Sequence, residues 1–447
     1  MKKIEDFGLS IPEILLPKNI DVSSWSVIAC DQYTQDLDYW KKAEASAAGK
    51  PSTLNLILPE VYLNSPDKPA RIEKIRKTMK EYLGETTSNG IFASPRKCMI
   101  YIERKTAFGR VRKGLVAQID LETYEWMPFS KANIRATEAT IVERIPPRME
   151  IRRGAPLELP HIMLLVDDKE DLLVGGTGNA VKSKTPLYDG SLMCNGGSIT
   201  GWAVESDSEI AGVTTAVEKV AEKNRAPDGS TFLFAVGDGN HSLATAKAVW
   251  DEYKEKLIAE GADDAKLAEC PVRYALVEIV NIYDKGLTFE PIHRVIFDCD
   301  VAGLISHLAE KLGGTITEVS KADELDAAVK ASWADFGFAY RENGVQKYVL
   351  LKTGIKELAV ARLQPEIDAF LKEAADSKKP EIDYIHGSEE TLKLGERDNA
   401  VGILLPPIAK DSFFETINGR GPLPRKSFSM GEADEKRFYL ECRKLFN

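Results

Sequence analysis

The segment TFLFAVGDGNHSLATAKAVW, residues 231–250, joins an apolar run to an amphipathic pattern through a short loop that contains two glycines. The apolar run at 232–236 has the length and composition of a buried strand. Leu243, Ala246 and Trp250 then recur at helical spacing, which predicts an amphipathic helix. Because a helix N-terminus has unsatisfied backbone N–H groups, this strand, loop and helix predict an anion-binding turn.

The loop itself carries the residues of the candidate site. Gly237 and Gly239 allow backbone conformations that a side chain would block. Asp238, Asn240 and His241 add an acid, an amide and a titratable imidazole. A carboxylate beside a helix N-terminus would compete with a phosphate for the same positive field. A Mg²⁺ ion held by Asp238 would remove this conflict, because the cation can bind the carboxylate and the phosphate together.

A simpler interpretation of the same loop needs no ligand. Asp238 and Asn240 would form an Asx-type turn, and Ser242 would cap the helix. The two interpretations are compatible, since a capped turn can also bind an anion.

The composition of the chain limits the classes of function. The chain has 447 residues, enough for two to three domain-sized units with a sizeable core. It is 43% hydrophobic and 29% charged, as is usual for soluble globular proteins. The formal net charge of −10 argues against a protein that coats nucleic acid, so nucleic acid is not expected as a partner.

Several absences in the sequence narrow the classes further. The six cysteines are scattered without a C-x-x-C pair, which is typical of a reducing compartment and offers no zinc spacing. No stretch of about eighteen apolar residues occurs, and the N-terminus has no apolar signal region, so we expect a cytoplasmic protein without a membrane partner. The sequence lacks both the P-loop G-x-x-x-x-G-K-[ST] motif and the G-x-S-x-G elbow of serine hydrolases.

Helix and strand patterns alternate irregularly along the chain, which predicts an α/β or α+β fold with a mixed sheet. A soft boundary near residue 300 separates a core, residues 1–300, from a C-terminal α+β region, residues 301–447. Helices are expected at 71–83, 208–224, 301–312, 322–331, 365–375 and 433–446. Strands are expected at 25–30, 98–103, 115–120, 160–166, 273–280, 294–297, 337–340, 347–351 and 401–405. Residues 175–179, GGTGN, are interpreted as a flexible loop.

Five segments spread along the chain resemble the motifs of one bacterial family. They are DGNHSLATA (238–246), RATE (135–138), GLTFEPIHR (286–294), DYIH (383–386) and PLPRKS (422–427). They are similar to the D-G-H-H-R-x-x-x-A, R-H-E-x-T, G-L-x-x-x-P-T-H-R, Y-x-H and P-x-K-S-T elements of the domain of unknown function 1015 family. That family is grouped with the ParB/sulfiredoxin-like superfamily, so the resemblance implies a core of that type elaborated by insertions.

The superfamily resemblance, which includes a distant one to a free serine kinase, implies a chemistry of nucleotide phosphates. It assigns Asp238 to the metal, and Asn240 and His241 to the phosphate. This chain departs from the signature at two positions, because Ser242 stands where the family has arginine and Asn240 replaces its first histidine. The missing positive charge would come from another basic residue. The candidates are Arg135, Arg144, Arg148, Arg294 and Lys426.

Three further residues have both a functional and a structural interpretation. His293 either donates a hydrogen bond to phosphate or shuttles a proton, or it is a buried histidine bonded to the backbone. Arg294 could form a phosphate fork, but adjacent strand residues face opposite ways, so one of the pair is expected to be structural. Glu138 is either a general base or second metal ligand, or a surface carboxylate paired with a nearby arginine. His161, which opens an apolar strand, is assigned a structural role.

These residues together predict Mg²⁺-dependent phosphoryl transfer or nucleotide hydrolysis on a small molecule, with a free amino acid such as serine as the most specific acceptor. ATP, ADP or pyrophosphate would supply the phosphate. Asp238 would hold the metal, the loop from Gly237 to His241 would cradle phosphate, and Glu138 would activate the acceptor hydroxyl. Arg294 and Arg135 would neutralise the developing charge. The alternative is a nucleotide-binding regulator, a ParB-like switch, that releases no small-molecule product.

Overall fold

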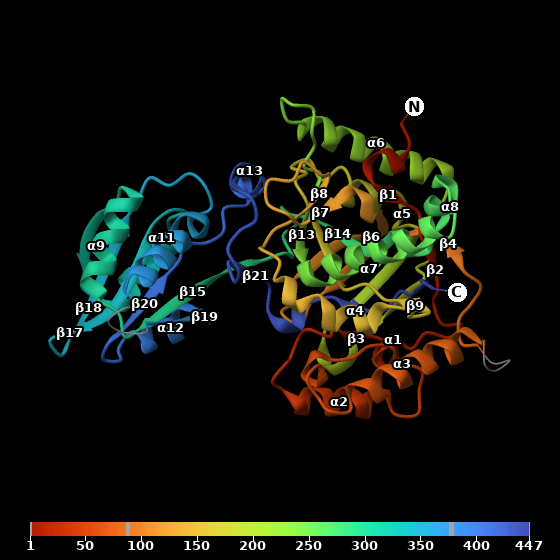
Figure 1. The fold of residues 1–447 in the computed structure, drawn as a ribbon, viewed down its shortest axis with the longest axis horizontal. Helices are drawn as coiled ribbons and strands as arrows, with labels where there is room; N and C mark the ends of the chain where they lie inside the picture. Colours follow the sequence, from red (N-terminus) through yellow and green to blue (C-terminus); the bar gives the residue numbers. More distant parts are fainter. Residues whose placement is uncertain (1, 86–89, 375–379, 447) are drawn as a thin grey trace. The chain divides into compact units, whose positions relative to one another are not determined.

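The computed structural model describes residues 2–85, 90–374 and 380–446 (Figure 1). The chain forms two compact units. The first contains Met1–Ala136, Thr140–Leu287 and Gly431–Asn447, and the second contains Thr137–Ala139 and Thr288–Met430. The sequence predicted a single boundary near residue 300, whereas in the structure the chain enters the second unit after Leu287 and returns to the first at Gly431.

The first unit is built on one large mixed sheet. Its strand order is β11-β12-β5-β6-β14-β10-β13-β8-β7, and β1 pairs with β6. The pairs β10–β14, β13–β8 and β7–β8 are parallel, and the other pairs are antiparallel. The strands are β1 (Leu9–Ser10), β5 (Met99–Lys105), β6 (Val111–Asp120), β7 (Tyr124–Glu125), β8 (Ile134–Ala136), β10 (Met163–Val166), β11 (Tyr188–Ser191), β12 (Ser198–Val204), β13 (Phe234–Asp238) and β14 (Tyr274–Asn281). The prediction of an α/β or α+β fold with a mixed sheet is therefore confirmed.

Helices cover both faces of this sheet, because the strands are apolar on both faces. Along β6, Leu115 and Ala117 belong to one hydrophobic core and Val116 belongs to another, as expected where successive side chains point to opposite faces. The helices are α1 (Val22–Trp25), α2 (Leu37–Ala47), α3 (Lys68–Leu83), α4 (Pro146–Arg152), α5 (Val174–Val181), α6 (Asp207–Lys223), α7 (Asn240–Ala259) and α8 (Asp264–Glu269). Residues of α6 and α7 pack in the first core, and residues of α2 and α3 pack in the second.

The second unit has a smaller sheet with strand order β16-β18-β17-β20-β15-β19, and β21 pairs with β15. The strands are β15 (Phe289–Phe297), β16 (Thr315–Val319), β17 (Phe336–Glu342), β18 (Val345–Lys352), β19 (Glu381–His386), β20 (Ala400–Leu404) and β21 (Phe428–Met430). The helices are α9 (Val301–Leu312), α10 (Ala322–Lys330), α11 (Ala359–Ala374), α12 (Ser388–Leu394) and α13 (Phe413–Arg420). The strands expected at 337–340 and 347–351 are confirmed as β17 and β18, which pair antiparallel as a hairpin.

The helix expected at 433–446 is wrong. This segment forms a short 3₁₀ turn (Ala433–Glu435), β22 (Phe438–Tyr439) and β23 (Arg443–Lys444). The strand β22 pairs with β3 (Val27–Ile28), and β23 pairs with β9 (Leu157–Glu158). Side chains from position 435 to 443 are all buried, so the segment crosses the interior instead of presenting one helical face to solvent.

Two other local predictions are also wrong. Residues 175–179 lie inside α5 instead of a flexible loop, because their glycines allow close packing. A Cβ atom at Gly178 would lie 2.4 Å from Cζ of Tyr101. Residues 25–30, expected as one strand, contain the end of α1 and the two-residue strand β3.

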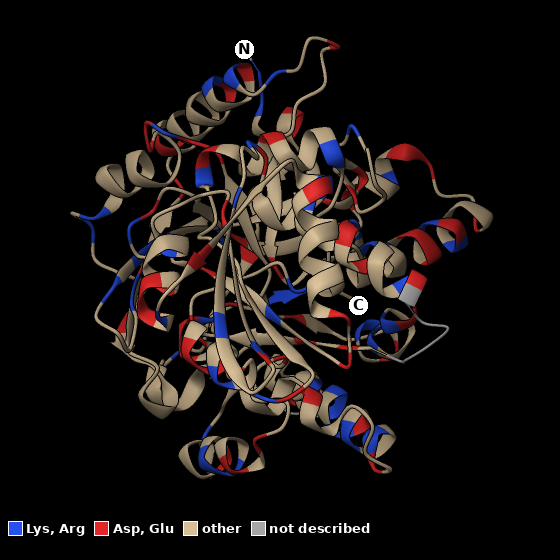
Figure 2. Cartoon of the chain, turned by 90° about the vertical axis from the view of Figure 1, so that its left-hand side faces the viewer, with Lys and Arg blue, Asp and Glu red and all other residues tan. Residues whose placement is uncertain are grey.

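Charged side chains of both signs occupy the helices. Figure 2 shows Lys and Arg positions interspersed with Asp and Glu positions along them. Pairs such as Lys247 with Asp251 on α7, with Nζ and Oδ1 2.7 Å apart, contribute little stability because solvent screens them. None of the helices in the described ranges is both long enough and apolar enough to span a lipid bilayer.

The C-terminal segment is anchored by ion pairs inside the first unit. Arg437, whose side chain is 2% exposed, pairs through Nη1 with Glu278 of β14. Its Nη2 lies 2.6 Å from Oε2 of Glu441, and Nε of Arg112 lies 3.4 Å from Oε1 of Glu278. Two arginines and two glutamates therefore compensate one another away from water.

The substitution Arg437→Met should be strongly destabilising. It leaves Glu278 and Glu441 buried without their shared cation, and breaking such a pair costs about 3–5 kcal/mol. Urea unfolding measures this cost as a loss in the free energy of unfolding.

The exposed pair between Arg96 and Glu205, with Nη2 and Oε1 2.6 Å apart, supplies the matched control. The substitution Arg96→Met should cost at most about 1 kcal/mol, because surface pairs contribute little. Equal losses in the two variants would contradict the account of a buried anchor.

Candidate functional site

The predicted turn lies where β13 ends and α7 begins. Strand β13 pairs with β10 on one side and β8 on the other, and its residues up to Val236 are buried. Gly239 follows with φ of +80°, and the 20-residue helix α7 starts at Asn240. A Cβ at Gly239 would lie 3.1 Å from Cγ1 and 3.2 Å from Cα of Ile162. Both the left-handed backbone and the close approach of Ile162 therefore favour glycine here.

Asp238 is paired with a lysine that comes from the C-terminal segment. Its Oδ2 atom lies 3.4 Å from Nζ of Lys436, and its Oδ1 accepts a hydrogen bond of 3.0 Å from the backbone N–H of Gly239. Both side chains are mostly buried, with 18% and 11% exposed. The sequence analysis missed Lys436, because nothing in its local pattern distinguishes it from a surface lysine.

Asp238 could hold a Mg²⁺ ion only if most of the other ligands came from outside the protein. Within the part of the chain that the structure describes, no three His, Cys, Asp or Glu side chains gather into a metal-binding group. Mg²⁺ commonly takes one or two protein carboxylates and fills its remaining positions with phosphate oxygens and water. Asp238 therefore suits a metal that arrives with a phosphate ligand.

His241, in the first turn of α7, is held neutral. Its Nε2 accepts a hydrogen bond of 3.4 Å from the backbone N–H of Ile141, so the remaining proton is on Nδ1. Burial, together with the charges of Arg148 and Arg144, lowers the pKa of His241 to about 4, although Asp31 acts in the opposite direction. Burial contributes most to this shift, and the two arginines add to it.

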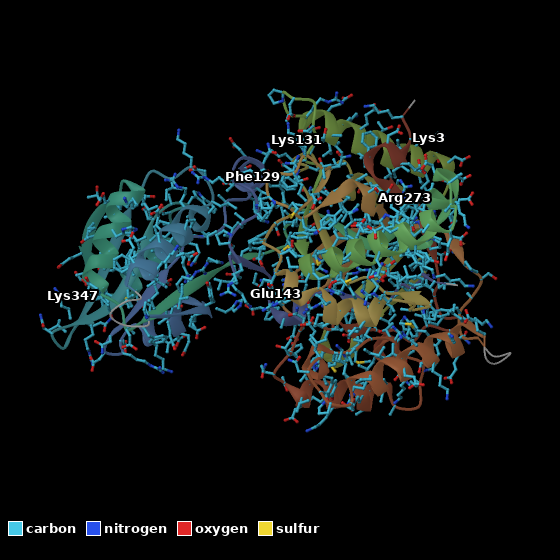
Figure 3. All side chains as sticks on the ribbon, in the orientation of Figure 1. Lys3, Phe129, Lys131, Glu143, Arg273 and Lys347 are labelled. Carbon is cyan, nitrogen blue, oxygen red and sulfur yellow. The ribbon has the colours of Figure 1, made fainter. Side chains whose placement is uncertain are left out.

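The two arginines belong to the 3₁₀ turn and the helix that follow Ile141, whose N–H donates to His241. Arg144 ends the 3₁₀ turn Val142–Arg144, which includes Glu143, labelled in Figure 3. Arg148 lies on α4, a helix that packs against α7. The sequence analysis named both as sources of positive charge, but it did not connect them to His241.

The simpler interpretation of the loop is correct in part. Asp238 and Asn240 do bond to neighbouring backbone, and Nδ2 of Asn240 donates to the carbonyl of Val236 at 3.5 Å. The expectation that Ser242 caps the helix is wrong. Gly239 occupies the N-cap position without a side-chain bond, and the Ser242 hydroxyl instead faces His161.

Ser242, His161 and Tyr439 form a hydrogen-bonded row that the sequence analysis also missed. Oγ of Ser242 lies 2.8 Å from Nε2 of His161, and Nδ1 of His161 lies 2.8 Å from the hydroxyl of Tyr439. The Tyr439 oxygen also accepts a hydrogen bond of 3.2 Å from the backbone N–H of Cys30. The three side chains come from distant parts of the sequence, so no spacing could have revealed them.

The predicted site residues fall into two sets. Gly237, Asp238, Gly239, Asn240 and His241 are consecutive in the first unit, which also contains Arg135. Arg135 lies on β8, where Nε donates to the carbonyl of Ala132 at 2.8 Å and the guanidinium lies 4.6 Å from the ring of Phe232. Burial lowers the pKa of Arg135. Glu138, His293, Arg294 and Lys426 all belong to the second unit.

Within the second unit, Arg294 is fully buried. Its Nε donates to Oε1 of Gln364 at 2.7 Å, and its guanidinium lies 4.7 Å from the ring of Tyr384. Burial lowers the pKa of Arg294 to about 10. Glu138 accepts a hydrogen bond of 3.3 Å from the backbone N–H of Ser427, next to Lys426, whose φ is +58°.

His293 has the geometry of a buried histidine bonded to the backbone. Its Nδ1 accepts a hydrogen bond of 3.0 Å from the N–H of Leu405, and the residue is 6% exposed. Burial lowers the pKa of His293 to about 4. Among the charges around it, Asp326 opposes this shift, whereas Arg294, Lys330 and His386 favour it.

This low pKa predicts a loss of stability in acid. His293 is neutral in the folded state down to about pH 4, whereas its unfolded pKa is near 6.5. The unfolded state therefore binds more protons between these values, and the free energy of unfolding falls as the pH falls through this window. The substitution His293→Asn retains an acceptor for the Leu405 N–H but does not titrate, so its stability should fall less between pH 7 and about 4.5.

Thermal unfolding followed by circular dichroism across this range measures the effect, and His241→Asn provides the parallel test in the first unit. Identical pH dependence in wild type and His293→Asn would contradict the assignment.

Comparisons with known proteins identify a family for the chain but no activity. Residues 14–384 match the model of the family described as "Protein of unknown function (DUF1015)", which confirms the resemblance seen in the motifs. No curated protein matches the chain. All three of the following solved structures are similar to it only at TM-scores below 0.5, too low to support an argument about chemistry.

A variant of a free serine kinase in complex with AMP has a TM-score of 0.38 and 12% identity, and the match covers 74% of this chain and 92% of that chain. A conserved hypothetical protein from Pyrococcus furiosus has a TM-score of 0.34 and 13% identity, with coverage of 74% and 94%. C-terminally truncated SbnI from Staphylococcus aureus has a TM-score of 0.32 and 9% identity, with coverage of 69% and 82%.

Proposed function

Because the chain belongs to the family described as protein of unknown function (DUF1015), its activity must be inferred from its own site, and we propose Mg²⁺-dependent phosphoryl transfer from a nucleotide to a small molecule. The observation that carries this proposal is the N-terminus of α7, which follows the buried strand β13 and has two arginines close enough to act on His241. Burial and two arginines lower the pKa of His241 there to about 4, at a helix N-terminus that follows a buried strand.

Three features would stabilise a phosphate here: the helix N-terminus, the arginine charges and a hydrogen bond from His241. The N-terminus of α7 carries a partial positive charge from its aligned peptide dipoles. Arg144 and Arg148 add charges that act on His241, although Arg148 also forms an ion pair with Glu60. Because His241 is neutral, it adds no further repulsion between cations and can still donate a hydrogen bond from Nδ1 to a phosphate oxygen.

Asp238 and Lys436 would exchange partners when the nucleotide binds. In the structure Lys436 forms an ion pair with Asp238, with Nζ and Oδ2 3.4 Å apart. A Mg²⁺ ion that accompanies the nucleotide would be held by Asp238 and would neutralise charge on the phosphates. Lys436 would then be released to contact a phosphate oxygen. The loop glycines Gly237 and Gly239 and the amide of Asn240 would position the backbone around the phosphate.

The other residues predicted from the sequence differ in how well they suit a role at a phosphate. Arg144 and Arg148 are better candidates for neutralising phosphate than Arg294, which is fully buried against Tyr384. Arg135, in the first unit, stays a candidate for the same role. The roles predicted for Lys426, Glu138 and His293, which belong to the second unit, stay predictions. A free amino acid such as serine is the acceptor that the sequence resemblance implies.

Calorimetric titration of ATP, ADP and pyrophosphate, with and without Mg²⁺, tests the phosphate site. The substitution Asp238→Asn should weaken Mg²⁺-dependent binding by about tenfold or more, because it removes the charged ligand of the metal. Binding without Mg²⁺ should stay equal or become tighter, because a negative charge near the phosphate is removed.

The substitution Asp251→Asn is the matched control, since it breaks an aspartate–lysine pair further along the same helix. It should leave all these affinities unchanged. Equal Mg²⁺-dependent binding by wild type and Asp238→Asn, or no binding by either, would remove the proposal. Turnover of hydroxyl acceptors then separates a kinase from a nucleotide-binding regulator, which would bind without releasing a phosphorylated product.

A further inference from the structure

A cavity of about 150 Å³ in the first unit reaches the first turn of α7. Most of its wall is aliphatic and includes Leu56, Leu58, Met79 and Leu445. An apolar cavity of about 150 Å³ is large enough for benzene, so the space suits a body of about six non-hydrogen atoms. The polar part of its wall includes four charged side chains and a row of hydroxyl and imidazole groups.

The main polar group in the wall is the row of Ser242, His161 and Tyr439, all of which line the cavity. Both tautomers of His161 are compatible with its contacts of 2.8 Å to Tyr439 and to Ser242, and the tautomer with the proton on Nδ1 leaves Nε2 to accept from Ser242. A hydroxyl, an imidazole and a third group that orients the imidazole are the parts of a proton-abstracting relay. Burial raises the pKa of Tyr439 well above its usual value, so its hydroxyl stays protonated.

The charged groups in the wall are already compensated. Arg148 pairs with Glu60, and Nη2 of Arg152 lies 2.8 Å from Oε1 of Glu158. Oε2 of Glu158 also accepts a hydrogen bond of 2.7 Å from Nε of Arg443. A zwitterion such as a free amino acid would have to lose its hydration against aliphatic walls, where each charged side chain of this set already forms an ion pair and, among their buried atoms, only Nε of Arg152 lacks a hydrogen-bond partner.

The cavity and the proposed phosphate site adjoin each other. Arg148 lines the cavity, and its charge also lowers the pKa of His241. Ser242 lines the cavity and follows His241 directly in the same helical turn. A hydroxyl bound against Ser242 would therefore lie close to a phosphate held at the start of α7.

We propose that this cavity binds the phosphoryl acceptor, an uncharged alcohol with an apolar body of about six non-hydrogen atoms, and that Ser242 and His161 remove its hydroxyl proton. This inference rests on the proposed function and replaces the free amino acid as the acceptor. It also gives a role to Ser242, which stands where the family signature has arginine.

The chemical step balances without a further reactant. The acceptor hydroxyl gives its proton to Oγ of Ser242 while Ser242 passes its own proton to Nε2 of His161. The acceptor oxygen forms a bond to the γ-phosphorus of a nucleoside triphosphate, and the bond from that phosphorus to the β–γ bridging oxygen breaks. The nucleoside diphosphate leaves with that electron pair, and the Tyr439 oxygen holds the Nδ1–H of the resulting imidazolium.

The test measures ADP formation from ATP and Mg²⁺ with cyclopentanol, glycerol or free serine as acceptor. Cyclopentanol should be phosphorylated with a kcat/KM at least about tenfold above that for serine, because only cyclopentanol suits the aliphatic wall. The substitution Ser242→Ala should lower kcat for cyclopentanol by about 10²-fold or more, as expected for loss of acid–base assistance, and leave ATP affinity unchanged. The conservative variant Ser242→Thr retains the hydroxyl and should recover part of the rate.

Cyclopentanol binding without nucleotide, measured by saturation-transfer NMR, gives a readout independent of turnover. The substitution Leu58→Trp should fill the cavity and abolish this signal, and Met79→Trp serves if the first variant does not fold. Faster turnover of serine, full activity of Ser242→Ala, or no cyclopentanol binding by wild type would overturn the inference. In each of these cases intact ATP binding leaves the proposed function standing, whereas absence of ATP binding removes both.

Discussion

The buried guanidinium of Arg437, held between Glu278 and Glu441, is the interaction on which the site depends. A charge away from water is tolerated only with compensating partners, so this contact fixes the path of the C-terminal segment through the first unit. That path carries Lys436 to the carboxylate of Asp238 and Tyr439 to the imidazole of His161. Two of the groups that define the candidate site therefore come from the last residues of the chain.

The first turn of α7 presents consecutive residues to two environments. Successive residues of an α-helix point about 100° apart, so His241 and Ser242 face different neighbours. His241 is buried within reach of the charges of Arg144 and Arg148, and Ser242 faces His161 and the aliphatic cavity. This division would allow one helical turn to hold a phosphate on one side and an uncharged acceptor on the other.

Local patterns predicted most of the elements but few of the partners. The strand, turn and helix at 231–250 are confirmed, because an apolar run, a positive-φ glycine and a helical period are local signals. The helix predicted for 433–446 is wrong. That segment is buried, and its charged side chains pair with residues as distant as Glu278. Lys436 and Tyr439 were missed for the same reason, and His161 was assigned only a structural role, since each has partners far away in the sequence. The family motifs supplied Asp238 and His241, but the cations around His241 required the three-dimensional structure.

A crystal structure of the protein with Mg²⁺ and a non-hydrolysable ATP analogue tests the central claim most directly. The account predicts the terminal phosphates at the N-terminus of α7, with Mg²⁺ on Asp238 and Nζ of Lys436 moved from the carboxylate to a phosphate oxygen. A nucleotide bound elsewhere, with Asp238 and Lys436 still paired as they are at 3.4 Å, would contradict it.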